Sequence, residues 1–338
     1  MARKTNIQWT HSTFSPWWGC TKVSPACDQC YAERDAKGEA VWGAGQPRRY
    51  FDDKHWSAPL RWDDMARARK AEDPSFQWRV FCASMSDVFD NEVAQEHRDR
   101  LWALIEETPN LTWMLLTKRI GNARRMIPER WSSYGFPENV WLGISVVTQE
   151  EADRDVPKLL SFHVPGKRFL SLEPLLEKVK LEGHTTLLAP GLTEGMDWLT
   201  GQTSQYSDIF GGDAYPWRER GIETSILHKE PHIHLVIVGG ESGEGARPMN
   251  PEWVRSLRDE CEVTGTDFMF KQWGEWAPLT GILQDEDDMG ALYPHHASPG
   301  LETYSFGHKN MVFLVGRSKT NRLLDGNTYD GGLSRVYD

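Results

Sequence analysis

The sequence predicts an α/β fold in which parallel strands form a partial or full (β/α) barrel. Short apolar runs recur along the chain, and most are followed by a polar turn and a helical pattern. Strands that are apolar throughout are typical of a parallel sheet covered on both faces. Repetition of this unit favours a barrel over a doubly wound sheet. We expect strands at 78–85, 111–117, 139–146, 168–175, 233–240 and 267–274, after a first candidate strand at 13–19.

Helices are expected between these strands. One is predicted over 92–107, where apolar residues recur at helical spacing. Another begins near Thr148, and Glu151 three residues later completes the pattern of a capping box. A third runs from Asn250, which precedes a proline, to Gly265. These signals predict helices between the strands, as the α/β fold requires.

The chain divides into a barrel core, an insertion and a C-terminal extension. The core covers residues 1–182 and 233–275 and carries a cysteine loop near its start. Residues 183–232 are rich in Gly, Thr and Ser, and we interpret them as an insertion that forms a lid or substrate loop. Residues 276–338 are expected to form an irregular extension.

The composition indicates a soluble globular protein. The chain has 338 residues, of which 39% are hydrophobic and 26% charged. No apolar run reaches the roughly 18 residues of a membrane helix. The first residues lack the apolar segment of a secretory signal. We therefore expect a cytoplasmic protein with no membrane partner.

The net charge and the position of the basic residues bear on whether the protein contacts nucleic acid. The net charge of −11 argues against a surface that coats nucleic acid. The basic residues either form a local basic face or are solvated helix ends. The residues in question are Arg48, Arg49, Lys118, Arg119, Arg124 and Arg125.

Three cysteines lie together near the start of the chain. Cys20, Cys27 and Cys30 have the spacing C-x6-C-x2-C. In a reducing compartment, clustered thiols indicate a metal site before they indicate disulfides. Three thiolates suit either zinc with a fourth protein ligand or an iron–sulfur cluster with one open iron. Ligand number alone leaves both alternatives open.

A zinc site would need a fourth ligand from elsewhere in the chain. The candidates are His11, Cys82 and Cys261, of which His11 is the better one but lies on the other side of the strand. Cys82 lies within a strand pattern and Cys261 within a helix pattern, so both are expected to be packed core thiols.

Polar residues follow most of the predicted strands. In a parallel barrel these positions converge at one mouth, and the cysteine loop, which follows the first candidate strand, would lie there too. Serine and aspartate in such places also cap helices, which is the structural alternative. The residues are Ser84, Ser86, Asp87, Lys118, Ser145, Glu173, Gly240, Glu241, Ser242 and Lys271.

The combination of motifs resembles the phage-associated three-cysteine-motif family, which is related to the radical SAM superfamily and occurs in bacteriophages and bacteria. The resemblance rests on the runs WWGCTKVSPACDQCYAE, FCASMSDVF, LLTKR, LGISV, RFLSLEPLL, VGGESGEGARPM and FKQWGEW. It covers residues 6–182 and 233–325. The long gap between Cys20 and Cys27 departs from the C-x3-C-x2-C spacing that is common in the superfamily.

The resemblance implies a fold like that of radical SAM enzymes and two cofactors. Cys20, Cys27 and Cys30 would ligate a [4Fe–4S] cluster whose open iron binds S-adenosylmethionine (SAM). Reductive cleavage of SAM would yield a 5′-deoxyadenosyl radical that abstracts hydrogen from the substrate. Tyr31 would pack near the cluster and adenine, and Asp87 would help to hold the SAM amino group. The other expected cofactor-binding residues are Ser84, Ser86, Ser145, Glu173, Gly240 and Ser242.

The resemblance also implies a substrate class and partners. Lys118, Glu241 and Lys271 would act on the substrate, although the two lysines equally suit pairing with Glu173 or Glu241. A modified thymidine in phage DNA is the expected substrate, for example isomerisation of an amino-acid adduct from N-linked to C-linked. The partners would be DNA or a modified nucleotide and an electron donor such as flavodoxin or ferredoxin. A phage-encoded protein would work in the host cytoplasm.

Two other functions remain as alternatives. The first is a zinc-stabilised nucleic-acid-binding or interaction protein without SAM chemistry. The second is a barrel hydrolase that uses Asp87, Glu173 and Glu241 as acid and base.

Overall fold

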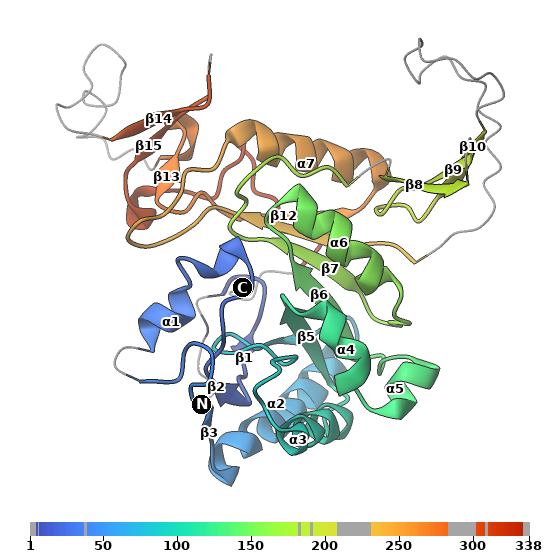
Figure 1. Cartoon of the computed structure of the whole chain (residues 1–338). Coiled ribbons are helices and arrows are strands. Elements are labelled where there is room, and N and C mark those ends of the chain that lie inside the picture. The colour runs from blue at the N-terminus through green and yellow to red at the C-terminus, as the bar shows by residue number, and fades with distance from the viewer. Residues whose placement is uncertain are drawn as a thin grey trace.

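The computed structural model describes residues 5, 7–36, 39–181, 184–189, 192–207, 231–282, 302–307 and 310–333. Its centre is a seven-stranded parallel sheet that curls into a partial barrel (Figure 1). The strands neighbour one another in chain order, which confirms the predicted α/β class with parallel strands. In order, they are β1 (Ser12–Thr13), β4 (Trp78–Cys82), β5 (Leu111–Thr117), β6 (Val140–Ser145), β7 (Arg168–Leu172), β11 (Leu235–Gly239) and β12 (Asp267–Gln272).

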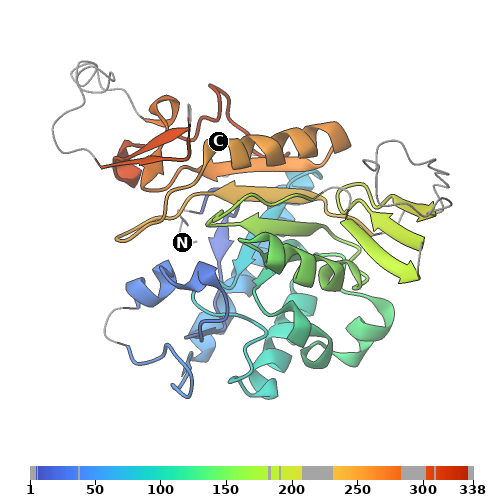
Figure 2. The same ribbon diagram turned by 45° about the horizontal axis from the view of Figure 1, so that its top comes forward.

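Helices pack on the outer face of this sheet, where their apolar sides and the outward strand residues form one large core (Figure 2). None of the described helices is long and apolar enough to cross a membrane. The helices are α2 (Asp53–Glu72), α3 (Gln95–Glu107), α4 (Ile120–Met126), α5 (Glu129–Tyr134), α6 (Gln149–Leu160) and α7 (Pro251–Thr264).

The inner face of the sheet is apolar toward the start of the strands and polar toward their ends. Trp141 and Phe169 belong to a small apolar cluster that fills the lower half of the partial barrel. Gly143 faces the Phe169 ring so closely that a Cβ atom there would lie 2.4 Å from Phe169 Cζ. Above this layer, Ser145 and Lys271 line an open space.

The local helix signals in the sequence are confirmed. Thr148 caps α6 by accepting a hydrogen bond from Glu151 N at 3.3 Å, and Glu151 in turn accepts from Val147 N at 3.0 Å. Asn250 caps α7, and Gly265 ends it with a left-handed φ of 72°. The reciprocal bond of the capping box thus reaches one residue earlier than the motif predicts.

The first predicted strand is wrong in extent. Only Ser12–Thr13 joins the parallel sheet, as β1. Trp17–Trp18 form a separate strand, β2, which pairs antiparallel with β3 (Arg49–Tyr50). Pro16 lies between the two segments and has no N–H to donate to a ladder, so the chain leaves the sheet there.

The longest described helix, α2, was not predicted. It contains Pro59, which normally ends a helical pattern. Asp52 caps the helix by accepting from His55 N at 3.2 Å. Its buried residues Trp56, Trp62 and Ala66 do recur at helical spacing, so this periodicity is the signal that could have revealed it.

The insertion does lie between two consecutive sheet strands, β7 and β11. Its described part is an antiparallel sheet of β8 (His184–Ala189), β9 (Leu192–Met196) and β10 (Thr203–Ser207). Ile233 N donates to Trp198 O at 2.8 Å, which holds this part near the start of β11. Figures 1 and 2 show it far from the cysteine loop, so the described part is not a lid. Residues 208–230 lie outside the described part of the chain.

The C-terminal extension is more regular than expected. The strands β13 (Trp276–Ala277), β14 (Thr303–Ser305) and β15 (Met311–Leu314) form an antiparallel sheet in the order β13–β15–β14. Trp276 and Val312 are buried, which supplies the apolar side that this small sheet needs. Residues 283–301 lie outside the described ranges.

Candidate functional site

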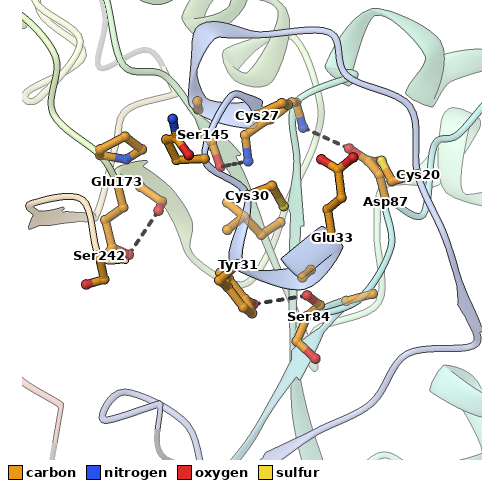
Figure 3. Close-up of a pocket in the computed structure, with 18 of the residues that line it drawn as sticks. Cys20, Cys27, Cys30, Tyr31, Glu33, Ser84, Asp87, Ser145, Glu173 and Ser242 are labelled. Carbon is orange, nitrogen blue, oxygen red and sulfur yellow. Dashed lines mark hydrogen bonds between the residues drawn. The ribbon is translucent and has the colours of Figure 1, made fainter. Parts of the chain in front are cut away.

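A cavity of about 420 Å³ opens at the carboxyl ends of the parallel strands (Figure 3). The three clustered cysteines and all the residues that the sequence assigned to catalysis or cofactor binding line this cavity, as expected for residues at one mouth of a parallel barrel. They are Cys20, Cys27, Cys30, Tyr31, Ser84, Ser86, Asp87, Lys118, Ser145, Glu173, Gly240, Glu241, Ser242 and Lys271.

The three cysteines come from one compact loop. Cys20 follows β2, Cys27 ends the short helix η1 (Pro25–Cys27), and Cys30 is the N-cap of α1 (Tyr31–Asp35). All three are free thiols that are partly exposed. Within the described ranges, no three His, Cys, Asp or Glu side chains are arranged to hold a metal ion. The thiols therefore share a cavity wall without converging.

Backbone contacts attach the start of this loop to the end of β4. Gly19 N donates to Met85 O at 3.1 Å. Gly19 has a φ of +111°, and a Cβ atom there would lie 2.3 Å from Val41 O. Only glycine fits this position, so the residue directly before Cys20 is fixed by close backbone approach.

Arg247 joins the middle of the loop to the segment after β11. Its backbone N, Nε and Nη2 donate to Glu241 at 2.9, 2.8 and 2.6 Å. The same guanidinium donates to Pro25 O at 2.9 Å and to Asp28 Oδ2 at 3.3 Å. Glu241, which is 6% exposed, therefore helps to position the cysteine loop. Its assigned role toward the substrate stays a prediction.

Asp87 is similarly engaged by protein groups. Its carboxylate accepts from Thr117 Oγ1 at 2.8 Å, Lys118 N at 3.0 Å and Phe89 N at 2.9 Å, and pairs with Arg119 at 3.3 Å. These contacts occupy the oxygen atoms that were expected to hold the SAM amino group, and that role remains untested.

Arg119 contacts the first cysteine directly, and sequence reasoning did not assign it a role in the site. Its Nη1 lies 3.2 Å from Cys20 Sγ. Burial and the Asp87 carboxylate raise the pKa of the Cys20 thiol to about 11, although Arg119 opposes this shift. The signal for Arg119 was its place just after β5, in the same turn as Lys118.

The two lysines differ in their partners. Lys271 Nζ pairs with Glu173 at 2.9 Å, so the predicted alternative of an ion pair holds for Lys271. Ser171 Oγ donates to the other Glu173 oxygen at 3.2 Å. Lys118 Nζ instead donates to Ser145 Oγ at 3.3 Å, and among the described residues it forms no ion pair.

The remaining predicted residues shape the opening. The Tyr31 hydroxyl donates to Ser84 O at 3.0 Å, and the residue as a whole is 43% exposed. Ser86 Oγ is buried and has no hydrogen-bond partner among the described residues. Ser242 Oγ accepts from Gln272 Nε2 at 2.9 Å. A Cβ atom on Gly240 would lie 1.8 Å from Trp273 O, so this position requires glycine.

The candidate fourth ligands for zinc lie outside the cavity. Cys82 and Cys261 are both 0% exposed within the outer core, which confirms that they are packed thiols. His11 Nδ1 accepts a hydrogen bond from Arg79 N at 3.0 Å, and its ring packs against Phe76. His11 therefore lies away from the three cysteines, as its place on the other side of the strand indicated, and its ring is used in β1–β4 packing.

The burial of His11 makes stability depend on pH. Desolvation, followed by the charges of Arg79 and Arg69, lowers the pKa of His11 from 6.5 to about 4. Between these values the unfolded chain binds a proton that the folded chain does not, so stability falls as the pH drops through this window. We expect His11→Gln to lose less stability than the wild type between pH 7 and 5 in urea titrations. Equal losses in both proteins would contradict this.

The six residues of the possible basic face do not all reach the surface. Arg48 and Arg119 are 6% and 8% exposed, and both are paired with buried carboxylates. The guanidinium of Arg49 lies over Trp18, 5.0 Å from the ring centroid. The alternative reading, solvated helix ends, is confirmed for Arg124 and Arg125, which are exposed in the last turn of α4, and is wrong for Arg48 and Arg119, because tertiary ion pairs bury them.

Comparison with known proteins places the chain in a family. Residues 4–332 match the sequence model of a family described as "Protein of unknown function (DUF5131)". The chain belongs to the DUF5131 family. The match spans the cysteine loop and all seven strands of the parallel sheet in this DUF5131 member. No curated protein and no solved structure matches the chain.

Proposed function

We propose that this protein is a radical SAM enzyme that uses a [4Fe–4S] cluster to cleave SAM and modify its substrate by hydrogen abstraction. One observation carries the proposal. Three free thiols from one loop line the same cavity as the polar residues at the ends of six parallel strands. The only other cysteines, Cys82 and Cys261, are buried elsewhere.

The number and kind of the donors, three thiols from one loop, match a cluster with one open iron. Cys20, Cys27 and Cys30 would hold three irons, and the candidate fourth ligands lie outside the cavity. Zinc in a structural site would need that fourth protein ligand, so the zinc alternative is disfavoured. When bound, such a cluster supplies the electron that cleaves SAM and leaves one iron free to chelate it.

The protein groups in the cavity would bind and orient the other molecules. Tyr31 lies at the opening, where its ring can cover a bound adenine. The Glu173–Lys271 pair places a carboxylate and an ammonium within 2.9 Å of each other, and Lys118 adds a second ammonium beside Ser145. These groups suit the zwitterionic amino-acid end of SAM or of an amino-acid adduct.

An apolar floor keeps water away from the base of the site. Trp9, Phe81 and Leu116 line the lower part of the cavity, and they belong to the apolar cluster inside the partial barrel. Exclusion of water protects reactive intermediates from side reactions. Hydrogen abstraction needs this protection, since a reactive species formed in the cavity must meet only the substrate.

The proposed substrate is a hypermodified thymidine of phage DNA, and the proposed reaction isomerises an amino-acid adduct from an N-linked to a C-linked form. The resemblance of the motifs supports this step. The protein would work in the cytoplasm with flavodoxin or ferredoxin as electron donor. Because Arg48 and Arg119 are buried, we favour entry of one nucleotide into the cavity over broad contact with duplex DNA.

The test is an anaerobic assay on the reconstituted protein. We expect a brown protein that binds iron and sulfide and releases 5′-deoxyadenosine from SAM in the presence of a strong reductant. Modified DNA and free modified nucleosides are compared as substrates by mass spectrometry. A protein that binds one zinc and no iron after anaerobic reconstitution would contradict the proposal.

The hydrolase alternative is weaker, because none of its three carboxylates is free. Glu241 pairs with Arg247, Asp87 with Arg119, and Glu173 with Lys271. An acid and a base for hydrolysis need carboxylates that can exchange protons with substrate and water.

A further inference from the structure

We infer that Arg119 is a positioning residue for the cluster: it fixes the Cys20 sulfur and raises the reduction potential of the bound group. This inference rests on the proposed function, because it needs an iron–sulfur cluster at Cys20, Cys27 and Cys30. It assigns a role to a residue that the cysteine motif does not contain.

The contacts of Arg119 fix its guanidinium against the loop. Nη1 donates to Cys20 Sγ at 3.2 Å, and Nη2 donates to Thr21 O. Two parallel contacts to adjacent residues suit the planar fork of arginine. The side chain is 6% exposed, so water competes little for these donors.

Asp87 fixes the position of the Arg119 guanidinium through an ion pair. The carboxylate lies 3.3 Å from Arg119 Nη1 and is itself fixed by Thr117 Oγ1 and by the backbone N–H groups of Lys118 and Phe89. Partners of this kind orient the groups around a metal site and adjust its electronic properties. Asp87 therefore acts on the site through Arg119.

The three cysteine sulfurs differ in the hydrogen bonds that they accept. Cys20 Sγ accepts a side-chain N–H, whereas in the described part of the chain no side chain donates to the sulfur of Cys27 or Cys30. Hydrogen bonds to ligand sulfur and nearby positive charge stabilise the reduced, more negative state of a cluster. Arg119 supplies the hydrogen bond at one corner of the site, and its charge offsets that of the Asp87 carboxylate beside it, which would stand uncompensated without Arg119.

The experiment measures the midpoint potential of the reconstituted cluster by redox titration followed with EPR. Arg119→Met is expected to shift the potential to a more negative value. Arg119→Lys keeps the charge and loses the fork, so a smaller shift in the same direction is expected. Arg125→Met is the matched control. Arg125 lies on α4, whose N-cap is Arg119; it is exposed and bonds to Asn122, so the potential of this variant should equal that of the wild type.

The outcomes separate this inference from the proposed function. A wild-type protein that binds no iron overturns both. A wild type and an Arg119→Met variant with the same iron content and the same potential overturn only the role of Arg119. If Arg119→Met does not fold, the shift in Arg119→Lys decides, and an unshifted potential there counts against the inference. Loss of iron from a variant with a wild-type circular dichroism spectrum supports the positioning of Cys20.

Discussion

Replacing Cys20, Cys27 and Cys30 together by alanine is expected to reduce iron binding and 5′-deoxyadenosine formation to the background of the protein-free reaction. The three thiols are the only cysteines that line the cavity. Each single replacement should have nearly the same effect, since two thiolates leave the cluster under-ligated. Iron content, sulfide content and 5′-deoxyadenosine are measured on anaerobically reconstituted proteins.

The control for these variants is Cys261→Ala. Cys261 is buried in α7, outside the cavity, so this variant should keep its iron and its activity. The small core cavity that it creates should cost about 1 kcal/mol of stability. Unchanged 5′-deoxyadenosine formation in the triple variant would contradict the proposed function.

The largest loss of stability is expected for Arg48→Met. The side chains of Arg48 and Asp90 are 1% and 2% exposed, and Arg48 Nε lies 2.8 Å from Asp90 Oδ2. Removal of one partner leaves a buried charge uncompensated, which costs about 3–5 kcal/mol. Arg48 also donates to Val41 O and Gln46 O, so the variant leaves these carbonyl groups without that donor.

The measurement is urea denaturation of Arg48→Met beside a matched surface variant, Arg67→Met. Arg67 pairs with Asp64, but these side chains are 70% and 68% exposed. Exposed pairs contribute about 0–1 kcal/mol, so Arg67→Met should be close to the wild type. Equal stability losses in the two variants would show that burial of the Arg48–Asp90 pair is not important.

Arg48→Met should also weaken the attachment of the cysteine loop. Arg48 Nη2 donates to Thr21 Oγ1 at 2.8 Å, and Thr21 directly follows Cys20. Loss of this bond removes one of the contacts that fix the start of the loop. We expect the variant, where it is still folded, to retain less iron than Arg67→Met.

The elements with local signals could be predicted from the sequence. The apolar run at 111–117 is strand β5, and the Asn250 and Gly265 caps bound α7. The place of the polar site residues also followed from local order, because the carboxyl ends of parallel strands meet at one edge. Periodicity and turn chemistry are enough for such features.

The partners of the site residues could not be predicted in this way. Arg119 and Cys20 are 99 positions apart, and Arg247 reaches Pro25 across 222 positions. No local pattern indicates such contacts. The sequence assigned Asp87 to SAM and Glu241 to the substrate, and it did not indicate that arginines would be the partners of both carboxylates.

The two ends of the partial barrel are held by different kinds of contact, and this bears on how the cysteine loop could take up the proposed cluster. The half at the start of the strands is held by the hydrogen bonds between strands and by apolar packing, which break only when the whole sheet unfolds. Across the mouth, the cysteine loop is fastened to the segment after β11 by side chains of Arg247 and Arg34, which are 33% and 43% exposed. The bonds that these partly exposed side chains make to Pro25 O, Asp28 Oδ2 and Ser242 O break singly and at small cost. The part of the loop that carries Cys27 and Cys30 can therefore move toward Cys20, which Arg119 holds, around the proposed cluster while the barrel beneath it stays folded.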